Sequence, residues 1–362
     1  MRVLACNSAY GDGGIGQHFA QLVEESRAAN QLQVYYSTGP KEGDRQGRLM
    51  QPPSWHGWIL HYTPARFSPK WRSHLNSELF DRWMARQLDT RAERFMGFAG
   101  NSLHTFRRAA ALGYEKLELV AATSHVDNVK RLHKRAEREL DTRDNWLHER
   151  EVRKTKQEYA MADVIYVHSD YTRDSFLAAG MPPDKLERTV LRVDPRFEPP
   201  ADRPDDGVFR VVYVGRLDPM KGIPLLLEAF AELPVAPKTL TLVGGWSSRA
   251  MRRYMEDWLA RDLDITMAPG DPLLALQRAD VFVHPAYQDG FGYAPMEALA
   301  CGVPVIATED TGMKEYIEHG TNGFVVPTGN MEALLQCLEE VAQHPLASTE
   351  PLLPSMEATA VG

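Results

Sequence analysis

Segments typical of buried strands alternate with segments typical of helices along almost the whole sequence. In the second half, the β-branched runs VFRVVYVGRL, KTLTLVGG and ADVFVHP are each followed by a helical pattern. The N-terminus has the same order: strand-like RVLAC, a glycine-rich loop, helical GQHFAQLVEESRAAN and strand-like LQVYYST. Such alternation predicts βαβ units and parallel sheets. We therefore expect an α/β fold with two Rossmann-like domains.

A segment dense in Pro and Asp, DPRFEPPADRPDDG, separates the two alternating regions and is typical of a linker. A chain of 362 residues also suits two domains. We expect a first domain at 1–197, a linker at 198–207, a second domain at 208–345 and a tail at 346–362. Two sheets joined in this way leave a cleft between them, which is a common place for a ligand.

Composition and charge limit the class of protein. Hydrophobic residues make up 43% and charged residues 25%, as in soluble globular proteins, and no apolar run reaches membrane-spanning length. Residues 1–200 carry a net charge of +4 and the remainder −12, and an acidic second half argues against a nucleic-acid binder. Cys6, Cys301 and Cys337 are odd in number and fall in expected core elements. Disulfides are therefore not expected, and a reducing cytoplasm fits best.

One stretch, HPAYQDGFGYAPMEALACGVPV, places two acids around a Gly-aromatic-Gly turn between an expected strand and an expected helix. Its loop lies where the carboxyl ends of the strands of an open α/β sheet bind ligands. Glu297 could accept two vicinal hydroxyls of a ribose, and Asp289 could hold hydroxyls of a sugar. The alternatives are a favourable acid in the first turn of a helix for Glu297, and an ordinary turn residue for Asp289.

Two cations follow the strand-like VVYVG. Arg216 and Lys221 stand after Gly215 and before the glycine that precedes the next helix. Cations at a strand end beside a helix N-terminus can bind a diphosphate, because they offset its charge while backbone amides donate to its oxygens. The alternative is a βα connection with two solvated cations.

The N-terminal loop AYGDGGIGQHF is rich in glycine. Gly11, Gly13 and Gly16 match G-x-G-x-x-G, but the acid expected at the end of LQVYYST for a dinucleotide is missing. NAD binding is therefore disfavoured. The glycines, Gly13 and Gly14 among them, still let backbone approach a ligand at a helix N-terminus.

Five motifs in order resemble the glycosyltransferase 4 family (glycosyl transferases group 1), whose members are retaining, nucleotide-sugar-dependent enzymes with the GT-B fold. The motifs are GGIGQH, SHVDNVKRLH, VGRLDPMKG, DGFGYAPMEALACGVPVIAT and GTNGFVVPTGN. The resemblance is strong from about Val208 to Gly329 and thinner in the first half. It implies an acceptor-binding first domain and a second domain that binds the nucleotide.

The resemblance also implies roles for particular residues. Arg216 and Lys221 would bind the pyrophosphate of the donor. Asp289 would contact the transferred sugar, and Glu297 would bind the ribose. His125, which follows a strand of the first domain, would lie near the reacting sugar. The expected catalytic residues are Asp289, His125, Arg216 and Lys221. The expected donor-binding residues are Gly13, Gly14, Gly215, Arg216, Lys221, Asp289, Gly290, Phe291, Gly292 and Glu297.

This sequence departs from the family pattern in three places. Asp289 stands where the family usually has Glu, which leaves the donor sugar open. Trp246 stands where the family often has a polar or acidic residue, and the tail lacks the aromatic-containing helix that usually closes the fold. Two further histidines, His168 and His284, are interpreted as structural.

The function predicted is transfer of a hexose from a UDP- or GDP-sugar to a hydroxyl of a glycan or glycolipid, with retention and without a metal or cofactor. No metal-ligand spacing stands out in the sequence. Three alternatives stay open: a nucleotide-sugar epimerase, a phosphorylase, and a catalytically idle sugar-nucleotide sensor.

Two Arg-rich helical stretches, at about 68–96 and 128–161, carry Trp71, Trp83 and Trp146. They are either solvated helix faces or a surface that rests on anionic lipid. The second interpretation predicts weak peripheral binding at the inner face of the membrane and suits a lipid-linked acceptor.

Overall fold

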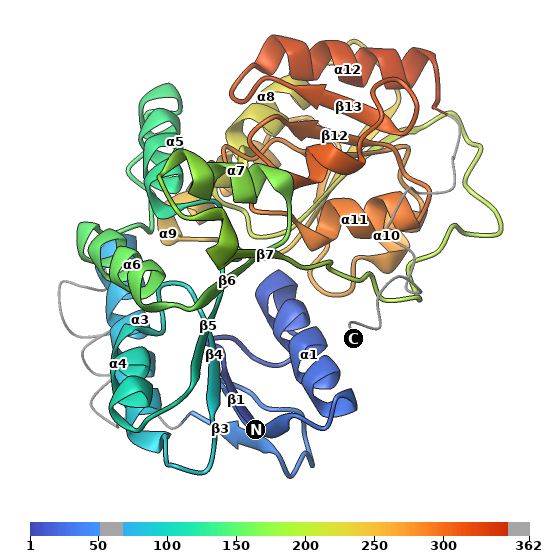
Figure 1. Cartoon of the computed structure of the whole chain (residues 1–362). Coiled ribbons are helices and arrows are strands. Elements are labelled where there is room, and N and C mark those ends of the chain that lie inside the picture. The colour runs from blue at the N-terminus through green and yellow to red at the C-terminus, as the bar shows by residue number, and fades with distance from the viewer. Residues whose placement is uncertain (51–67, 347–362) are drawn as a thin grey trace. The chain divides into compact units, whose positions relative to one another are not determined.

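The computed structural model describes residues 1–50 and 68–346, and its contacts divide the chain into two compact units (Figure 1). The first unit comprises Met1–Lys130 and Asn145–Thr189, and the second comprises Arg131–Asp144 and Val190–Gly362. This division falls at Thr189, earlier than the expected domain end at 197, and assigns residues 131–144 to the second unit. The expected boundaries of linker and tail stay predictions.

The first unit is built on a seven-stranded parallel sheet with the order β3-β2-β1-β4-β5-β6-β7. The strands are β1 Arg2–Ala5, β2 Leu32–Ser37, β3 Gly47–Leu49, β4 Arg94–Phe98, β5 Lys116–Val120, β6 Val164–Val167 and β7 Leu186–Arg188. The parallel α/β architecture expected from the sequence is confirmed here.

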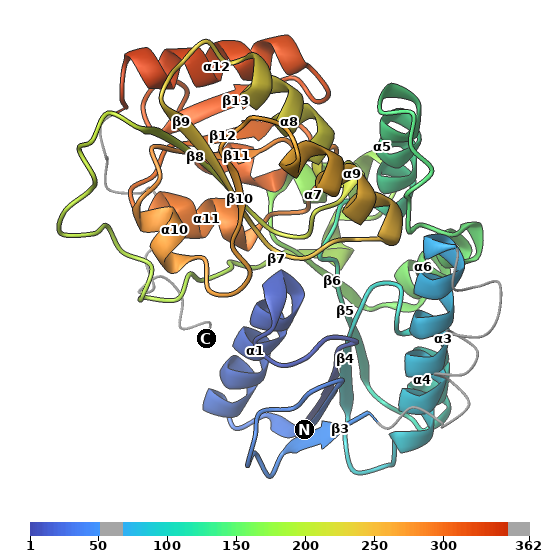
Figure 2. The ribbon, with the colours of Figure 1, turned by 180° about the vertical axis from the view of Figure 1, so that it is seen from behind.

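Helices cover both faces of this sheet. Figures 1 and 2 show α1 (Gly13–Ala28) on one face and α3 (Pro69–Gln87), α4 (Leu103–Ala111) and α6 (Glu149–Met161) on the other. The other helical elements are α7 Asp170–Ala178, the 3-10 turn η2 Pro183–Lys185, and α5 Val126–Glu139, whose last residues belong to the second unit.

Two expectations for this unit are wrong in detail. The helix expected over 68–96 ends at Gln87, before β4. The helical stretch expected over 128–161 is two helices, α5 and α6. Residues 51–67 lie outside the described residues.

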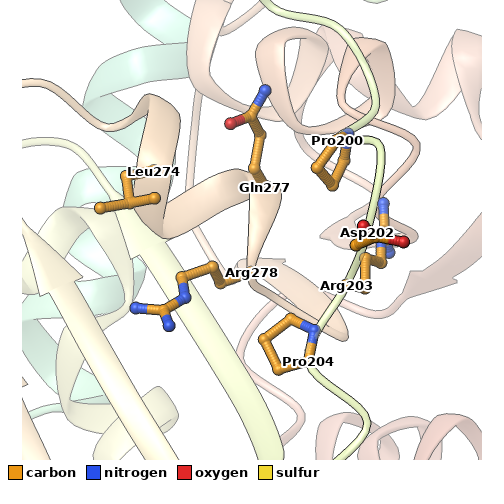
Figure 3. Close-up of a pocket in the computed structure, with 7 residues that line it drawn as sticks. All are labelled: Pro200, Asp202, Arg203, Pro204, Leu274, Gln277 and Arg278. Carbon is orange, nitrogen blue, oxygen red and sulfur yellow. The ribbon is translucent and has the colours of Figure 1, made fainter.

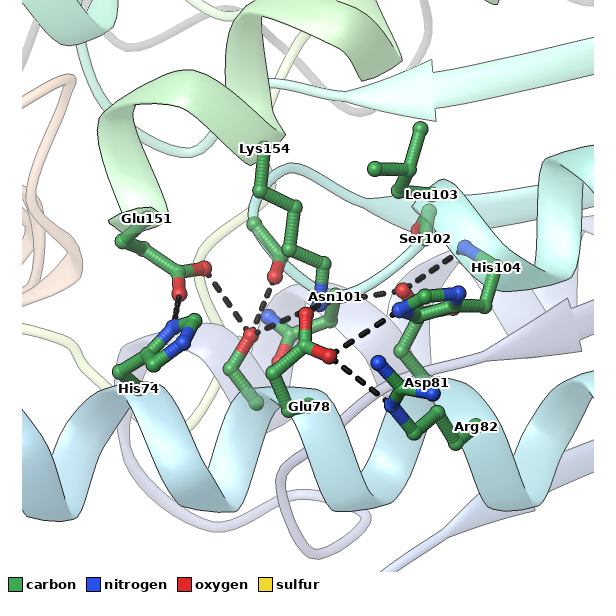
Figure 4. Close-up of polar contacts among 12 residues, drawn as sticks. His74, Glu78, Asp81, Arg82, Asn101, Ser102, Leu103, His104, Glu151 and Lys154 are labelled. Carbon is green, nitrogen blue, oxygen red and sulfur yellow. Dashed lines mark hydrogen bonds and ion pairs between the residues drawn. The ribbon is translucent and has the colours of Figure 1, made fainter. Parts of the chain in front are cut away.

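A buried ionic network joins α3, α4 and α6 (Figure 4). Lys154 Nζ on α6 lies 3.0 Å from Asp81 Oδ2 on α3, and both side chains are almost fully buried. Asp81 and Glu158 accept hydrogen bonds from the first turn of α4, whose N–H groups have no partner within the helix. The donating groups belong to Ser102, Leu103, His104 and Thr105. Charge and capping together thus fix the three helices against each other.

The second unit is built on a six-stranded parallel sheet with the order β10-β9-β8-β11-β12-β13. The strands are β8 Phe209–Val214, β9 Lys238–Val243, β10 Ile265–Met267, β11 Val281–His284, β12 Val305–Thr308 and β13 Gly323–Val326. The runs VFRVVYVGRL, KTLTLVGG and ADVFVHP, expected as strands, form β8, β9 and β11. Of these, β8 and β11 are nearly continuous in hydrophobic residues, as is typical of strands buried on both faces.

Two apolar clusters form on the two faces of this second sheet. One packs α8, α9 and α12 against it through residues such as Leu226, Met255 and Leu338. The other packs α10 and α11 through Leu276 and Met296. The helical elements are α8 Ile223–Glu232, α9 Arg249–Leu259, α10 Leu273–Gln277, α11 Tyr293–Ala300, α12 Met331–Gln343, η3 Pro219–Lys221 and η4 Gly312–Tyr316.

Both sheets reverse their strand order at one point. In the first sheet the reversal lies between β1 and β4, and in the second between β8 and β11. Loops that leave the carboxyl ends of two such neighbouring strands run to opposite sides, which opens a crevice where ligands of α/β proteins bind. This topology therefore points to the loops after β8 and β11.

Candidate functional site

The loops after β8 and β11 are in direct contact within the second unit. The backbone N–H of Tyr287 donates to the carbonyl oxygen of Met220 at 2.9 Å. Gly222 has φ +72°, and a Cβ there would lie 2.0 Å from the carbonyl oxygen of Pro285. A residue with a side chain would push the loops apart, so glycine is needed at this position.

This contact brings Lys221 and Asp289 together. Lys221 Nζ lies 2.7 Å from Asp289 Oδ2, and His284 Nε2 lies 3.1 Å from the same oxygen. Burial alone would raise the pKa of Asp289, but the charge of Lys221 and the hydrogen bond from His284 outweigh it and hold this pKa well below its usual range. Asp289 is therefore ionised at neutral pH.

Arg216 lies on the same edge of the sheet. Its guanidinium pairs with Asp218 at 2.8 Å, and its side chain is 53% exposed, against 26% for Lys221. The hydroxyl of Tyr213 donates to the carbonyl oxygen of Arg216 at 2.9 Å, which fixes the backbone while the side chain remains accessible. Gly215 takes a positive φ of 144° just before it. An exposed cation, Arg216, and a partly buried one, Lys221, thus follow the end of β8.

The Gly-aromatic-Gly turn starts α11 earlier than expected. The cap is Gly292, with φ +99°, and the first helical residue is Tyr293, four positions before Glu297. Glu297 therefore stands in the second turn and is only 4% exposed. Its interpretation as an acid of the first turn is wrong, and a carboxylate buried there must be compensated by other contacts.

The other residues of the turn, Gly290, Phe291 and Gly292, contribute backbone rather than exposed side chains. Phe291 is 3% exposed and packs edge-on against Tyr316, with ring centroids 5.4 Å apart. Its side chain therefore anchors the turn in the core. Gly290 and Gly292 flank it and leave the backbone near Asp289 without side chains.

In the first unit, Gly13 and Gly14 are the first two residues of α1. Gly13 has φ +59° and open space around its Cα, whereas a Cβ on Gly16 would lie 2.2 Å from the carbonyl oxygen of Ala9. Asp12 makes no side-chain cap to the helix. The N-terminus of α1 is thus a suitable place for an anion.

His125 precedes α5 and is 5% exposed. Its backbone N–H donates to Ser175 Oγ at 2.8 Å, and its Nδ1 accepts from the backbone N–H of Asp127 at 3.3 Å. The ring packs against Tyr159 and Phe176. Burial lowers the pKa of His125, so its imidazole is neutral at pH 7.

Sequence reasoning missed the role of His284, which was interpreted as packing. It is buried, yet it hydrogen-bonds Asp289. The signal in the sequence is a histidine as the last residue of β11, five positions before the acid. His168 is also buried, accepts or donates one hydrogen bond with Thr189 Oγ1, and packs against His18, which agrees with a structural role.

A cavity of about 400 Å³ lies elsewhere on the second unit (Figure 3). Its lining residues are Pro200, Asp202, Arg203, Pro204, Leu274, Gln277 and Arg278. None of them is among the expected site residues. Within residues 1–50 and 68–346, no group of three or more His, Cys, Asp or Glu side chains is placed to hold a metal ion.

Part of the chain matches a known family. The model of the family "Glycosyl transferases group 1" matches residues 196–350, which include Arg216, Lys221, Asp289 and Glu297. Through these residues the chain is similar to glycosyl transferases group 1. A relative, D-inositol 3-phosphate glycosyltransferase of Rhodococcus erythropolis, is 34% identical over 161 residues, which are 40% of this chain and 36% of the relative. The chain thus matches little more than a third of that relative's length.

Solved structures show that the likeness in fold extends beyond the family match. Sucrose-phosphate synthase of Thermosynechococcus elongatus superposes with a TM-score of 0.70 at 20% identity, over 95% of this chain and 90% of that one. The Anabaena protein HepE, in complex with UDP and glucose, gives 0.67 at 16% identity, over 97% and 93%. The chain therefore has the GT-B fold, with two Rossmann-like domains.

Proposed function

We propose that this protein is a retaining, metal-independent glycosyltransferase that moves a hexose from a UDP- or GDP-sugar to a hydroxyl of a glycan or glycolipid. The observation that carries the proposal is the pairing of Lys221 with Asp289 at the reversal point of the second sheet, beside the exposed Arg216. The family match over these residues supports it. The UDP and glucose bound by the similarly folded HepE support a nucleotide-sugar donor.

Each residue of the site has a role in this proposal. Arg216 and Lys221 bind the donor diphosphate, where their positive charge stabilises the negative charge that develops as the sugar leaves. Asp289 holds hydroxyls of the transferred sugar. Glu297 accepts the two hydroxyls of the ribose.

The proposed reaction proceeds on one face of the sugar. The bond between the anomeric carbon and the phosphate oxygen breaks while a bond to the acceptor oxygen forms on the same side, so the configuration is retained. The proton of the acceptor hydroxyl passes to a phosphate oxygen of the leaving diphosphate. No separate carboxylate base is required, and the buried, neutral His125 lies near the sugar rather than acting as the base.

The acceptor is proposed to be a glycan or a lipid-linked sugar, and the place of action the cytoplasm or the inner face of the membrane. Of the three Trp residues in the Arg-rich stretches, Trp71 is 38% exposed, whereas Trp83 and Trp146 pack against the core. Several cations there are paired with acids, as in Lys130 with Glu149. Any lipid contact would therefore be weak. In the part of the chain described, no helix is both long and apolar enough to cross a membrane.

A panel of UDP- and GDP-hexoses tests the proposal by release of the nucleotide, with and without glycan and glycolipid acceptors. We expect one donor to release nucleotide faster when an acceptor is present, and we expect the rate to survive excess EDTA. Tight binding of a sugar nucleotide without any release would favour an idle sensor. Loss of activity in EDTA that Mg²⁺ or Mn²⁺ restores would contradict metal independence.

A further inference from the structure

The buried side chain of His284 contacts the carboxylate of Asp289 in the candidate site. It is the last residue of β11, is 3% exposed, and its Nε2 lies 3.1 Å from Asp289 Oδ2. Its other nitrogen, Nδ1, is buried and has no hydrogen-bond partner among the residues described. A proton on Nδ1 would be a buried donor without an acceptor, which is costly. The geometry therefore favours the tautomer that donates Nε2–H to Asp289.

Lys221 and His284 thus contact the same oxygen of Asp289, and their side chains differ in conformational freedom. Lys221 reaches Oδ2 with a flexible side chain that is 26% exposed, whereas the side chain of His284 is 4% exposed and fixed at a strand end. Both contacts fall on Oδ2, so neither occupies Oδ1. Lys221 can turn toward a bound anion, but His284 cannot follow it.

The backbone around Asp289 is fixed as well. Its N–H donates to the carbonyl oxygen of Asp310 at 3.2 Å, and its carbonyl oxygen accepts from Gly312 at 3.1 Å. With the backbone held, the direction of the carboxylate depends on the partners of its side chain. Removing Lys221 from Oδ2 would leave the hydrogen bond of His284 to set that direction.

We propose that His284 is a positioning residue, which keeps the carboxylate of Asp289 directed at the transferred sugar while Lys221 binds the donor diphosphate. This inference rests on the proposed function. When the donor binds and Lys221 leaves Asp289, the hydrogen bond from His284 would still hold the carboxylate. A merely structural histidine would only fill space beneath the loop.

Two substitutions separate these roles. His284→Leu fills a similar space without a donor, and His284→Gln keeps an amide that can donate to Asp289 Oδ2. For each protein, kcat is measured at saturating donor and acceptor, the Kd for the donor by calorimetry, and folding by thermal unfolding. We expect His284→Leu to lower kcat by roughly tenfold or more, the scale of a lost hydrogen bond to a charged group, while the donor Kd changes less than about twofold. His284→Gln should recover most of that kcat.

Other outcomes are equally informative. Wild-type kcat in His284→Leu would overturn the positioning role, and so would equal losses in both variants that follow a fall in thermal stability. Absence of nucleotide release from wild-type protein with every sugar nucleotide would overturn the proposed function, and this inference with it. A failure of the inference alone is thus distinguished by an active wild-type enzyme.

Discussion

Lys221 and Asp289 stand 68 positions apart in the sequence, yet Lys221 Nζ and Asp289 Oδ2 are 2.7 Å apart. The pair forms because β8 and β11 are neighbours in the sheet and their loops meet at Gly222. Each member stabilises the charge of the other. A diphosphate that binds Lys221 must therefore compete with Asp289, and the protein must hold the carboxylate by other means when it does.

The first prediction concerns Arg216. Arg216→Ala should lower turnover by about a hundredfold, the scale for loss of one preorganised group that stabilises developing charge. Folding should be unaffected, because the side chain is more than half exposed. Steady-state kinetics and thermal unfolding measure both. Arg252→Ala is the matched control, since it removes another exposed, ion-paired arginine of the same unit, on α9. Equal turnover in wild type and Arg216→Ala would exclude a role in the diphosphate site.

The sequence predicted most strands that are buried on both faces. The runs around β8 and β11 are almost wholly apolar, because helices cover both sides of each strand. Three strands of the first unit were missed. β3 and β7 are the edges of its sheet, and each has three residues, two of them exposed, so no apolar pattern marks them. The third, β4, lies inside the sheet and is overlapped by the helix expected over 68–96. Edge pairing depends on the neighbouring strand and not on the residues' own hydrophobicity.

The sequence indicated which residues form the candidate site, but not how their side chains contact one another. Motif spacing indicated Arg216, Lys221, Asp289 and Glu297. It did not indicate that His284 donates to Asp289, because that contact depends on how the chain turns after β11. The start of α11 at Tyr293 was missed for a similar reason: Gly292 takes a positive φ, and this local geometry places the cap. That shift moved Glu297 from the first turn into the second.

A second prediction separates the two acids. Glu297→Gln should weaken donor binding, because its carboxylate would pair with the ribose, remote from the bond that breaks. Asp289→Asn should mainly slow transfer or alter the choice of sugar, since contacts to the sugar can strengthen in the transition state. Donor titration by calorimetry and kinetics on both variants decide between them. Indistinguishable effects of the two changes would remove this division of roles.

A third prediction follows from His168. Burial lowers its pKa from 6.5 to about 4, and burial together with His168 also lowers the pKa of His18. As the pH falls, the unfolded chain therefore takes up protons before the folded protein does. The contribution of these histidines to the free energy of unfolding is complete above about pH 6.5 and is lost toward pH 4. For His168 alone this loss is at most about 3 kcal/mol. Burial raises the pKa of Glu158 in the same unit to about 7, which acts in the opposite direction.

The test for His168 uses a variant with the same hydrogen bond. His168→Asn keeps a polar group near Thr189 Oγ1 but does not titrate, and it leaves Glu158 unchanged. Urea unfolding midpoints are compared at pH 8 and pH 5. We expect the midpoint to fall less on acidification in the variant than in wild type. A fall of the same size in both proteins would show that His168 does not contribute.

A fourth prediction concerns lipid. The first half should bind anionic membranes weakly and reversibly through Lys and Arg at about 66–94 and 129–156, of which residues 66 and 67 lie outside the described part. Each basic residue near the surface contributes about 1 kcal/mol, but neighbouring acids cancel much of it. Salt screens the remaining attraction. Liposome flotation at low and high ionic strength measures it, with Trp71→Ala as a variant that lacks the exposed indole. Equal recovery on neutral and anionic vesicles, or none on either, would favour a soluble acceptor.

The most direct test of the account is nucleotide release by Lys221→Ala, measured with the donor and acceptor that wild type uses. Lys238→Ala is the matched control, because Lys238 begins β9 at the opposite end of the same sheet. We predict that Lys221→Ala loses about a hundredfold in kcat, since it removes a charge-stabilising cation and the ion-pair partner of Asp289 together. Lys238→Ala should retain wild-type turnover. Near wild-type release by Lys221→Ala would contradict the proposal that the reversal point of the second sheet is the donor site.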